Sequence, residues 1–141
     1  MSHYQYTLSF QLTDDCPQSV VDFFAQLADG QTPEVVPEVD ERQLETSPGE
    51  VIALVANRTT LADRRVTIAG AASAEEFFMP FIALAEWLAR WSADEGPVGY
   101  YHLTSLAHPT LLYFAQGKPY MLQATGTPVG LADGEEMPQE E

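Results

Sequence analysis

The sequence predicts an α+β fold in which an antiparallel or mixed sheet carries two helices on one face. Three observations predict it: a stretch of alternating polar and apolar residues near the N-terminus, two segments with helical periodicity, and several short β-type segments in the last third of the chain. Helices that follow strands and cover one face of such a sheet form a two-layer sandwich. The 141 residues, 45% of them hydrophobic, suit one domain with an ordinary core.

Residues 4–13 are predicted to form a strand with one buried face. Apolar side chains alternate with glutamine, threonine and serine over ten residues, and this period of two is typical of a half-buried strand. Such strands belong to sheets that expose one face to water. The apolar set is Tyr4, Tyr6, Leu8, Phe10 and Leu12.

A helix is predicted to follow this strand. Asp14 and Asp15 place negative charge at its start, and Pro17 suits the first helical position. The apolar residues from Val20 to Leu27 recur at helical spacing, and Gly30 suits the position after the last turn.

The middle of the chain is predicted to contain a long acidic connection and two strands. The connection, residues 29–49, holds three prolines and six acids, and it includes a short edge strand at 34–39. Residues 51–56 are continuously apolar and β-branched, which favours a central buried strand. Residues 65–69 are predicted as its hairpin partner, with 57–64 as the loop.

The second helix begins at a capping box, in which Ser73 and Glu76 satisfy each other's backbone N–H groups. Apolar residues follow at helical spacing as far as Trp91, and Glu86 and Arg90 are placed to form an i,i+4 ion pair. Pro80 removes one backbone hydrogen bond and is expected to kink the helix.

Three strands are predicted after this helix, at 98–106, 111–115 and 120–124. The resulting order, β-α-β-β-α-β-β-β, is the ferredoxin-like order β-α-β-β-α-β with an added C-terminal hairpin. Residues 126–141 are polar and acidic and are expected to form a disordered tail. The domain therefore comprises residues 1–125.

The charge of the chain excludes several functions. Six Lys and Arg against 21 Asp and Glu give a formal net charge of −15. Binding to nucleic acid or to an anionic membrane surface depends on basic residues, so neither partner is expected. The N-terminus lacks the features of a signal peptide, and no apolar run reaches the ~20 residues that cross a bilayer, so a cytoplasmic protein is predicted.

The sequence predicts no catalytic residue, no metal site and no cofactor. The single cysteine, Cys16, forms no internal disulfide, and its acidic neighbours disfavour the thiolate. His3, His102 and His108 follow no metal-ligand spacing, and no phosphate-binding glycine motif is present.

Several segments resemble those of small bacterial proteins of unknown function. They are Tyr6-Thr7-Leu8-Ser9-Phe10 followed by Asp15 and Pro17, and Gly99-Tyr100 with Pro109–Phe114 and Gly117–Tyr120. In size and acidity the chain is also similar to immunity proteins of bacterial toxin systems. This resemblance implies no catalytic residue.

We therefore predict a non-catalytic binding protein that masks a basic protein partner, as an immunity or inhibitor protein does. Acids of the connection would meet Lys and Arg of the partner, and side chains of the open sheet face would act as anchors. The expected contact residues are Glu34, Glu38, Asp40, Glu41 and Glu45, with Tyr100 and His102.

Three alternatives remain open at this point. Solubility or salt adaptation also explains the acidity. A small enzyme or small-molecule-binding protein would use a pocket between sheet and helices, and its candidate residues are Phe77, Phe78, Trp87, Trp91 and His102. A homodimer would pair through an edge strand.

Overall fold

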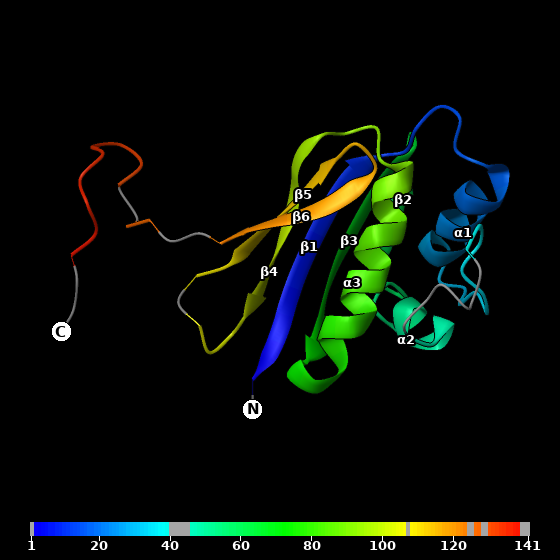
Figure 1. Ribbon diagram of the computed structural model, residues 1–141, viewed down its shortest axis with the longest axis horizontal. Coiled ribbons are helices and arrows are strands. Elements are labelled where there is room, and N and C mark those ends of the chain that lie inside the picture. Colours follow the sequence, from blue (N-terminus) through cyan, green and yellow to red (C-terminus); the bar gives the residue numbers. More distant parts are fainter. Residues whose placement is uncertain (1, 40–45, 107, 124–125, 128–129, 139–141) are drawn as a thin grey trace.

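The computed structural model describes residues 2–39, 46–106, 108–123, 126–127 and 130–138 (Figure 1). Its six strands form one antiparallel sheet in the order β2-β3-β1-β4-β5-β6, and three helices pack beside it. The predicted α+β class is confirmed. The elements are β1 (His3–Gln11), α1 (Gln18–Ala28), α2 (Pro48–Ala53), β2 (Thr59–Ala62), β3 (Arg65–Ser73), α3 (Ala74–Trp91), β4 (Gly96–Leu103), β5 (Thr110–Ala115) and β6 (Lys118–Gln123).

Strand β1 lies inside the sheet, between β3 and β4. Its predicted alternation is confirmed, because Tyr6, Leu8 and Phe10 are buried whereas the residues between them face outward. Burying each of these side chains contributes about 1.5–3 kcal/mol of stability.

Aromatic side chains from the helices pack on the buried face of β1. The ring of Phe77 in α3 stacks on Tyr4 with centroids 4.2 Å apart, and Phe24 in α1 meets Phe10 edge-on at 6.3 Å. Helix α1 also packs against β2, and α2 packs against α3. The core therefore lies between one face of the sheet and the helices.

The strand predicted at 51–56 is wrong, because residues 51–53 are the end of α2 and residues 54–56 form turns. Pro48 occupies the first turn of the helix, and the Ser47 hydroxyl accepts a hydrogen bond from the backbone N–H of Glu50 at 3.3 Å. The run of apolar residues reflects burial and not strand structure, since Val51, Ile52, Leu54 and Val55 are all buried. The strand that pairs with β3 is β2, which lies within the predicted hairpin loop.

Two other predicted details, the strand at 34–39 and the Ser73 capping bond, also need correction. Residues 34–39 form bends and turns and not an edge strand. Ser73 is the N-cap of α3, as expected, but its side chain makes no capping hydrogen bond. Pro80 is buried inside α3, which continues to Trp91.

A buried hydrogen-bond chain ties α2 to the sheet. The Tyr6 hydroxyl donates to the carbonyl of Leu54 at 2.7 Å, and Arg58 Nη1 donates to the Tyr6 oxygen at 2.8 Å. Burial raises the pKa of Tyr6, although the hydrogen bond and charge of Arg58 act in the opposite direction. The chain of contacts therefore fixes the residues that follow α2 beneath β1.

Gly99 allows β4 to approach β1. It lies opposite Leu8, and a Cβ atom at this position would lie 1.9 Å from the carbonyl oxygen of Thr7. The obstructing atoms belong to the backbone of the central strand, so no side-chain rotation can relieve the clash.

We expect Tyr6→Phe to lower the free energy of unfolding by about 1–2 kcal/mol at neutral pH, because it leaves Leu54 and Arg58 without their partner. Its second effect is on pH dependence. Because burial raises the pKa of Tyr6 above its ordinary 10.0, the unfolded chain loses this proton first. Wild-type stability therefore decreases as pH rises above 10.0 and through the folded pKa. Urea unfolding between about pH 9 and about pH 11 should show a smaller decrease for Tyr6→Phe. Equal decreases in the stability of wild type and Tyr6→Phe would contradict the raised pKa of the Tyr6 hydroxyl.

We expect Gly99→Ala to lower the free energy of unfolding by about 2 kcal/mol or more, because β4 must move away from β1. The matched control is Gly49→Ala in α2, where a Cβ meets no atom within 4 Å. This substitution should raise stability by about 0.5–1 kcal/mol, as alanine does inside a helix. Denaturant titration measures both, and a loss of stability in the control would contradict the helical assignment of α2.

Candidate functional site

Negative charge is segregated from the sheet. None of the six described strands contains an Asp or Glu residue, although the chain carries 21 of them. The described acids lie in the three helices, in the turns and connections, and in the segment after β6. Since net charge sets the field outside a protein, the helices and connections are the source of the negative potential.

The described part of the acidic connection, residues 29–39 and 46–49, is held on the helices. Val36 is buried, and the indole Nε1 of Trp87 in α3 donates to the carbonyl of Pro37 at 2.8 Å. Ser19 of α1 donates to Glu38 Oε1 at 3.0 Å, and Arg90 of α3 donates to the carbonyl of Glu38 at 3.4 Å. These contacts fix residues 36–38 across α1 and α3.

The predicted contact residues divide between two sides of the sheet. Glu34 and Glu38 are exposed on the helical side. Tyr100 and His102 instead face outward from β4, where they lie opposite Thr7 and Gln5 of β1. The predicted acids Asp40, Glu41 and Glu45 lie outside the described residues. The structure therefore does not bring the sheet residues together with the described acids.

Sequence reasoning missed the residues that position the acidic connection. Arg90 was expected to pair with Glu86, but its guanidinium donates to the Glu38 carbonyl. Trp87 has the helical spacing of a core residue, and its ring is indeed buried, but its indole N–H reaches the connection. A contact between Trp87 and Pro37, fifty residues apart, has no signal in the sequence itself. Val35, which lies beside Glu34 and is 59% exposed, is an apolar surface residue that the sequence reasoning also missed.

The described arginines are engaged inside the protein. Arg64 donates to the carbonyl of Thr13, and Arg58 and Arg90 also bond neutral oxygens. In the described part of the chain the one ion pair joins Arg65 to Asp94, at 3.1 Å. Most described carboxylates therefore have no cationic neighbour within the chain, and their charge acts on the solvent.

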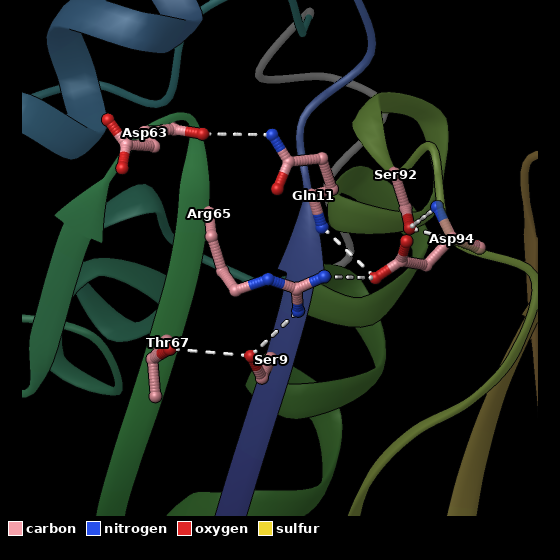
Figure 2. A network of polar contacts seen from close by, with 7 residues as sticks. All are labelled: Ser9, Gln11, Asp63, Arg65, Thr67, Ser92 and Asp94. Carbon is pink, nitrogen blue, oxygen red and sulfur yellow. Dashed lines mark hydrogen bonds and ion pairs between the residues drawn. The ribbon is translucent and has the colours of Figure 1, made fainter.

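The outward face of β1 and β3 carries a network of hydrogen bonds that includes the Arg65–Asp94 ion pair (Figure 2). Arg65 lies between Ser9 Oγ and Asp94 Oδ2, 3.1 Å from each. The backbone N–H of Gln11 also donates to Asp94 Oδ2, at 3.2 Å. This network joins the α3–β4 connection to the sheet, so its polar groups have a structural role.

Cys16 is half-buried near the start of α1. Burial raises the pKa of its thiol, Arg64 lowers it, and Asp15 raises it further. The thiol is therefore protonated at neutral pH. Within the described ranges, no group of three or more His, Cys, Asp or Glu residues is placed to hold a metal ion.

An apolar groove of about 300 Å³ lies between α3 and the strands β4–β6. Phe77, Phe81 and Tyr101 form its floor, and Phe78 and Met121 are half-exposed at its opening. Of the five predicted pocket residues only Phe77 and Phe78 line this groove. Trp87 packs against Phe23, Trp91 is partly buried in the core, and His102 faces outward.

A wider hollow of about 710 Å³ lies where α2 meets the start of α3. Its lining combines Arg58 with the carboxylates of Glu50, Glu75 and Glu76. The acids outnumber the base there, which disfavours an anionic ligand.

No helix among the described residues has the length and apolar character needed to cross a membrane. Comparison with known proteins gives no relative: no family model, no curated protein and no solved structure matches this chain.

Proposed function

We propose that this chain is a non-catalytic acidic binding protein that masks a basic protein partner, as an immunity or inhibitor protein does. The observation that carries the proposal is the segregation of charge. In a chain of net charge −15, the six strands hold no acid, and within the described ranges the acids lie in the helices, the connections and the segment after β6. Solubility alone requires a net charge but no such division.

The binding surface that we propose is the acidic connection together with the helices beneath it. Contacts from Ser19, Trp87 and Arg90 hold residues 37 and 38 in place before any partner arrives. A charged segment that is already ordered loses less conformational entropy on binding. Glu34 and Glu38 would meet Lys or Arg of the partner, with Val35 as an apolar contact between them.

Tyr100 and His102 have a different place in this proposal. A partner seated on the acidic connection cannot also cover the outward face of β4 unless it wraps around the sheet. We therefore assign the electrostatic contact to the connection. The two sheet residues are anchors only for a partner that extends around the sheet edge.

We also infer a ferredoxin-like unit with an added hairpin. The order β2-β3-β1-β4 supports it, because one strand lies between the two strands that each crossover helix joins. Contacts of α1 and α3 with the same face of β1 support helices on one side of the sheet. Strands β5 and β6 then form the hairpin, and α2 is an insertion before β2.

The apolar groove supports a second candidate function. A small apolar ligand would fit between α3 and the strands β4–β6, where the lining is almost entirely aromatic and aliphatic. This candidate corresponds to the small-molecule-binding protein that the sequence analysis left open. Thermal shift with a panel of apolar ligands tests it, and a ligand should protect the wild type more than a Phe78→Glu variant.

Neutralising the acids of the connection tests the main proposal. We expect replacement of Glu34, Glu38, Asp40, Glu41 and Glu45 by their amides to weaken binding of the partner by about 30-fold, since five exposed pairs contribute about 0.4 kcal/mol each. The partner is first captured from a lysate of the source organism, then purified and titrated by calorimetry at two salt concentrations. High salt should weaken wild-type binding most.

The matched control neutralises five acids of the C-terminal tail instead. The amide variant at Asp133, Glu135, Glu136, Glu140 and Glu141 has the same net charge as the first variant. Its affinity should stay within about threefold of the wild type, because it loses the same net charge but keeps every acid of the proposed binding surface. Equal losses in the two variants, or none in either, would overturn the proposed surface.

A further inference from the structure

Strand β6 is an exposed edge of the sheet. It is last in the strand order, and three consecutive residues, Tyr120, Met121 and Leu122, are 52%, 63% and 52% exposed. Apolar edge strands pair readily with other chains, and proteins usually protect them with lysine or other charges, proline, bulges or covering elements. Lys118 and Pro119 occupy only the first two positions of β6, and the residues after them carry neither device. The opposite edge, β2, has only four residues and packs against α1. The β6 edge therefore has the character of an interface.

The charge distribution favours a second copy of this chain at that edge. Two molecules of net charge −15 repel each other wherever their acids meet. The strands β4, β5 and β6 contain no acid, and Lys118 is the one charged residue of β6. A basic partner finds no complementary charge there, whereas two copies can meet without repulsion.

The position of Pro119 identifies the groups that face the free edge. Along an antiparallel strand, backbone groups point alternately toward one neighbour and the other. Proline lacks an N–H and occupies edge strands with that side turned away from the ladder. Pro119, Met121 and Gln123 therefore direct their backbone groups to the free edge, and Tyr120 and Leu122 direct theirs to β5.

We propose that β6 pairs antiparallel with β6 of a second copy, with Met121 opposite Met121, to form one continuous sheet. In this register the two Met121 residues exchange both backbone hydrogen bonds, and each Gln123 N–H donates to the Pro119 carbonyl of the other copy. Every outward N–H finds an acceptor, and the missing proline N–H falls at the ends of the ladder. On the outward face, Tyr120 of each copy lies opposite Leu122 of the other.

The apolar groove strengthens this interface on the helical face. It runs beside β6, and Phe78 and Ile82 of α3 are 46% and 39% exposed in its lining. Because the twofold axis passes through the Met121 pair, the grooves of the two copies adjoin. Their apolar linings are then removed from water together, at about 25 cal/mol for each Å² buried. Glu86 is the one acid of the lining.

Cysteine crosslinking tests the register. In a Cys16→Ser background, Met121→Cys places two thiols opposite each other, with Cα atoms about 5.5 Å apart and within disulfide range. Gln123→Cys is the matched control, because four residues at about 3.4 Å each separate its two copies beyond that range. Mild oxidation should convert Met121→Cys almost completely to a disulfide-linked dimer and leave the two copies of Gln123→Cys unlinked. Equal crosslinking of the two variants would overturn the register.

Light scattering on the unlinked protein tests the assembly itself. Wild type should give twice the chain mass of 15.5 kDa, and Met121→Lys should give the monomer mass. Met79→Lys is the control, because Met79 is 48% exposed on α3 but lines the other hollow, and it should stay dimeric. A monomeric wild type at all concentrations would overturn the proposal. Neither result depends on the acidic connection, so this test is independent of the proposed function.

Discussion

The close pairing of β1 with two neighbours is the constraint on which the rest of the structure depends. β1 is bonded to β3 along its whole length and to β4 along half of it, and its inward side chains meet both long helices. Gly99 makes the second pairing feasible, because any side chain there would collide with the backbone of Thr7. The strands beyond β4, including the edge strand β6, are connected to the central strand through this pairing, in addition to their own contacts with Phe10 and α3.

The parts of the fold with a simple period could be predicted from the sequence. A period of two over ten residues identified β1 and its buried face, and helical spacing identified α1 and α3. The segment 51–56 shows no period in sequence, because all six of its residues are apolar, although only Val51, Ile52, Leu54 and Val55 are buried. Its β-branched residues then favoured a strand, although Ser47 and Pro48 carried the signal of a helix start.

The candidate site could be predicted less well than the fold. The exposure of Glu34 and Glu38 could be predicted because both are charged and lie in an acidic connection. The face of the sheet on which that connection lies depends instead on tertiary contacts. The indole of Trp87 and the guanidinium of Arg90 place it on the helices, and both contacts span about fifty residues of sequence. Local patterns contain no information at that separation, so Tyr100 and His102 were grouped with acids that lie across the sheet.

The exposed β6 edge also gives the acidic charge a protective role. Within β6, Lys118 and Pro119 protect only the start of the strand, so the charge of the whole molecule supplies the remaining protection. At neutral pH repulsion between helical layers limits association to the acid-free edge. Near the isoelectric point of 4.2 this repulsion vanishes. Surfaces other than the β6 edge are then also free to associate, and acid favours precipitation over the ordered pairing of two copies.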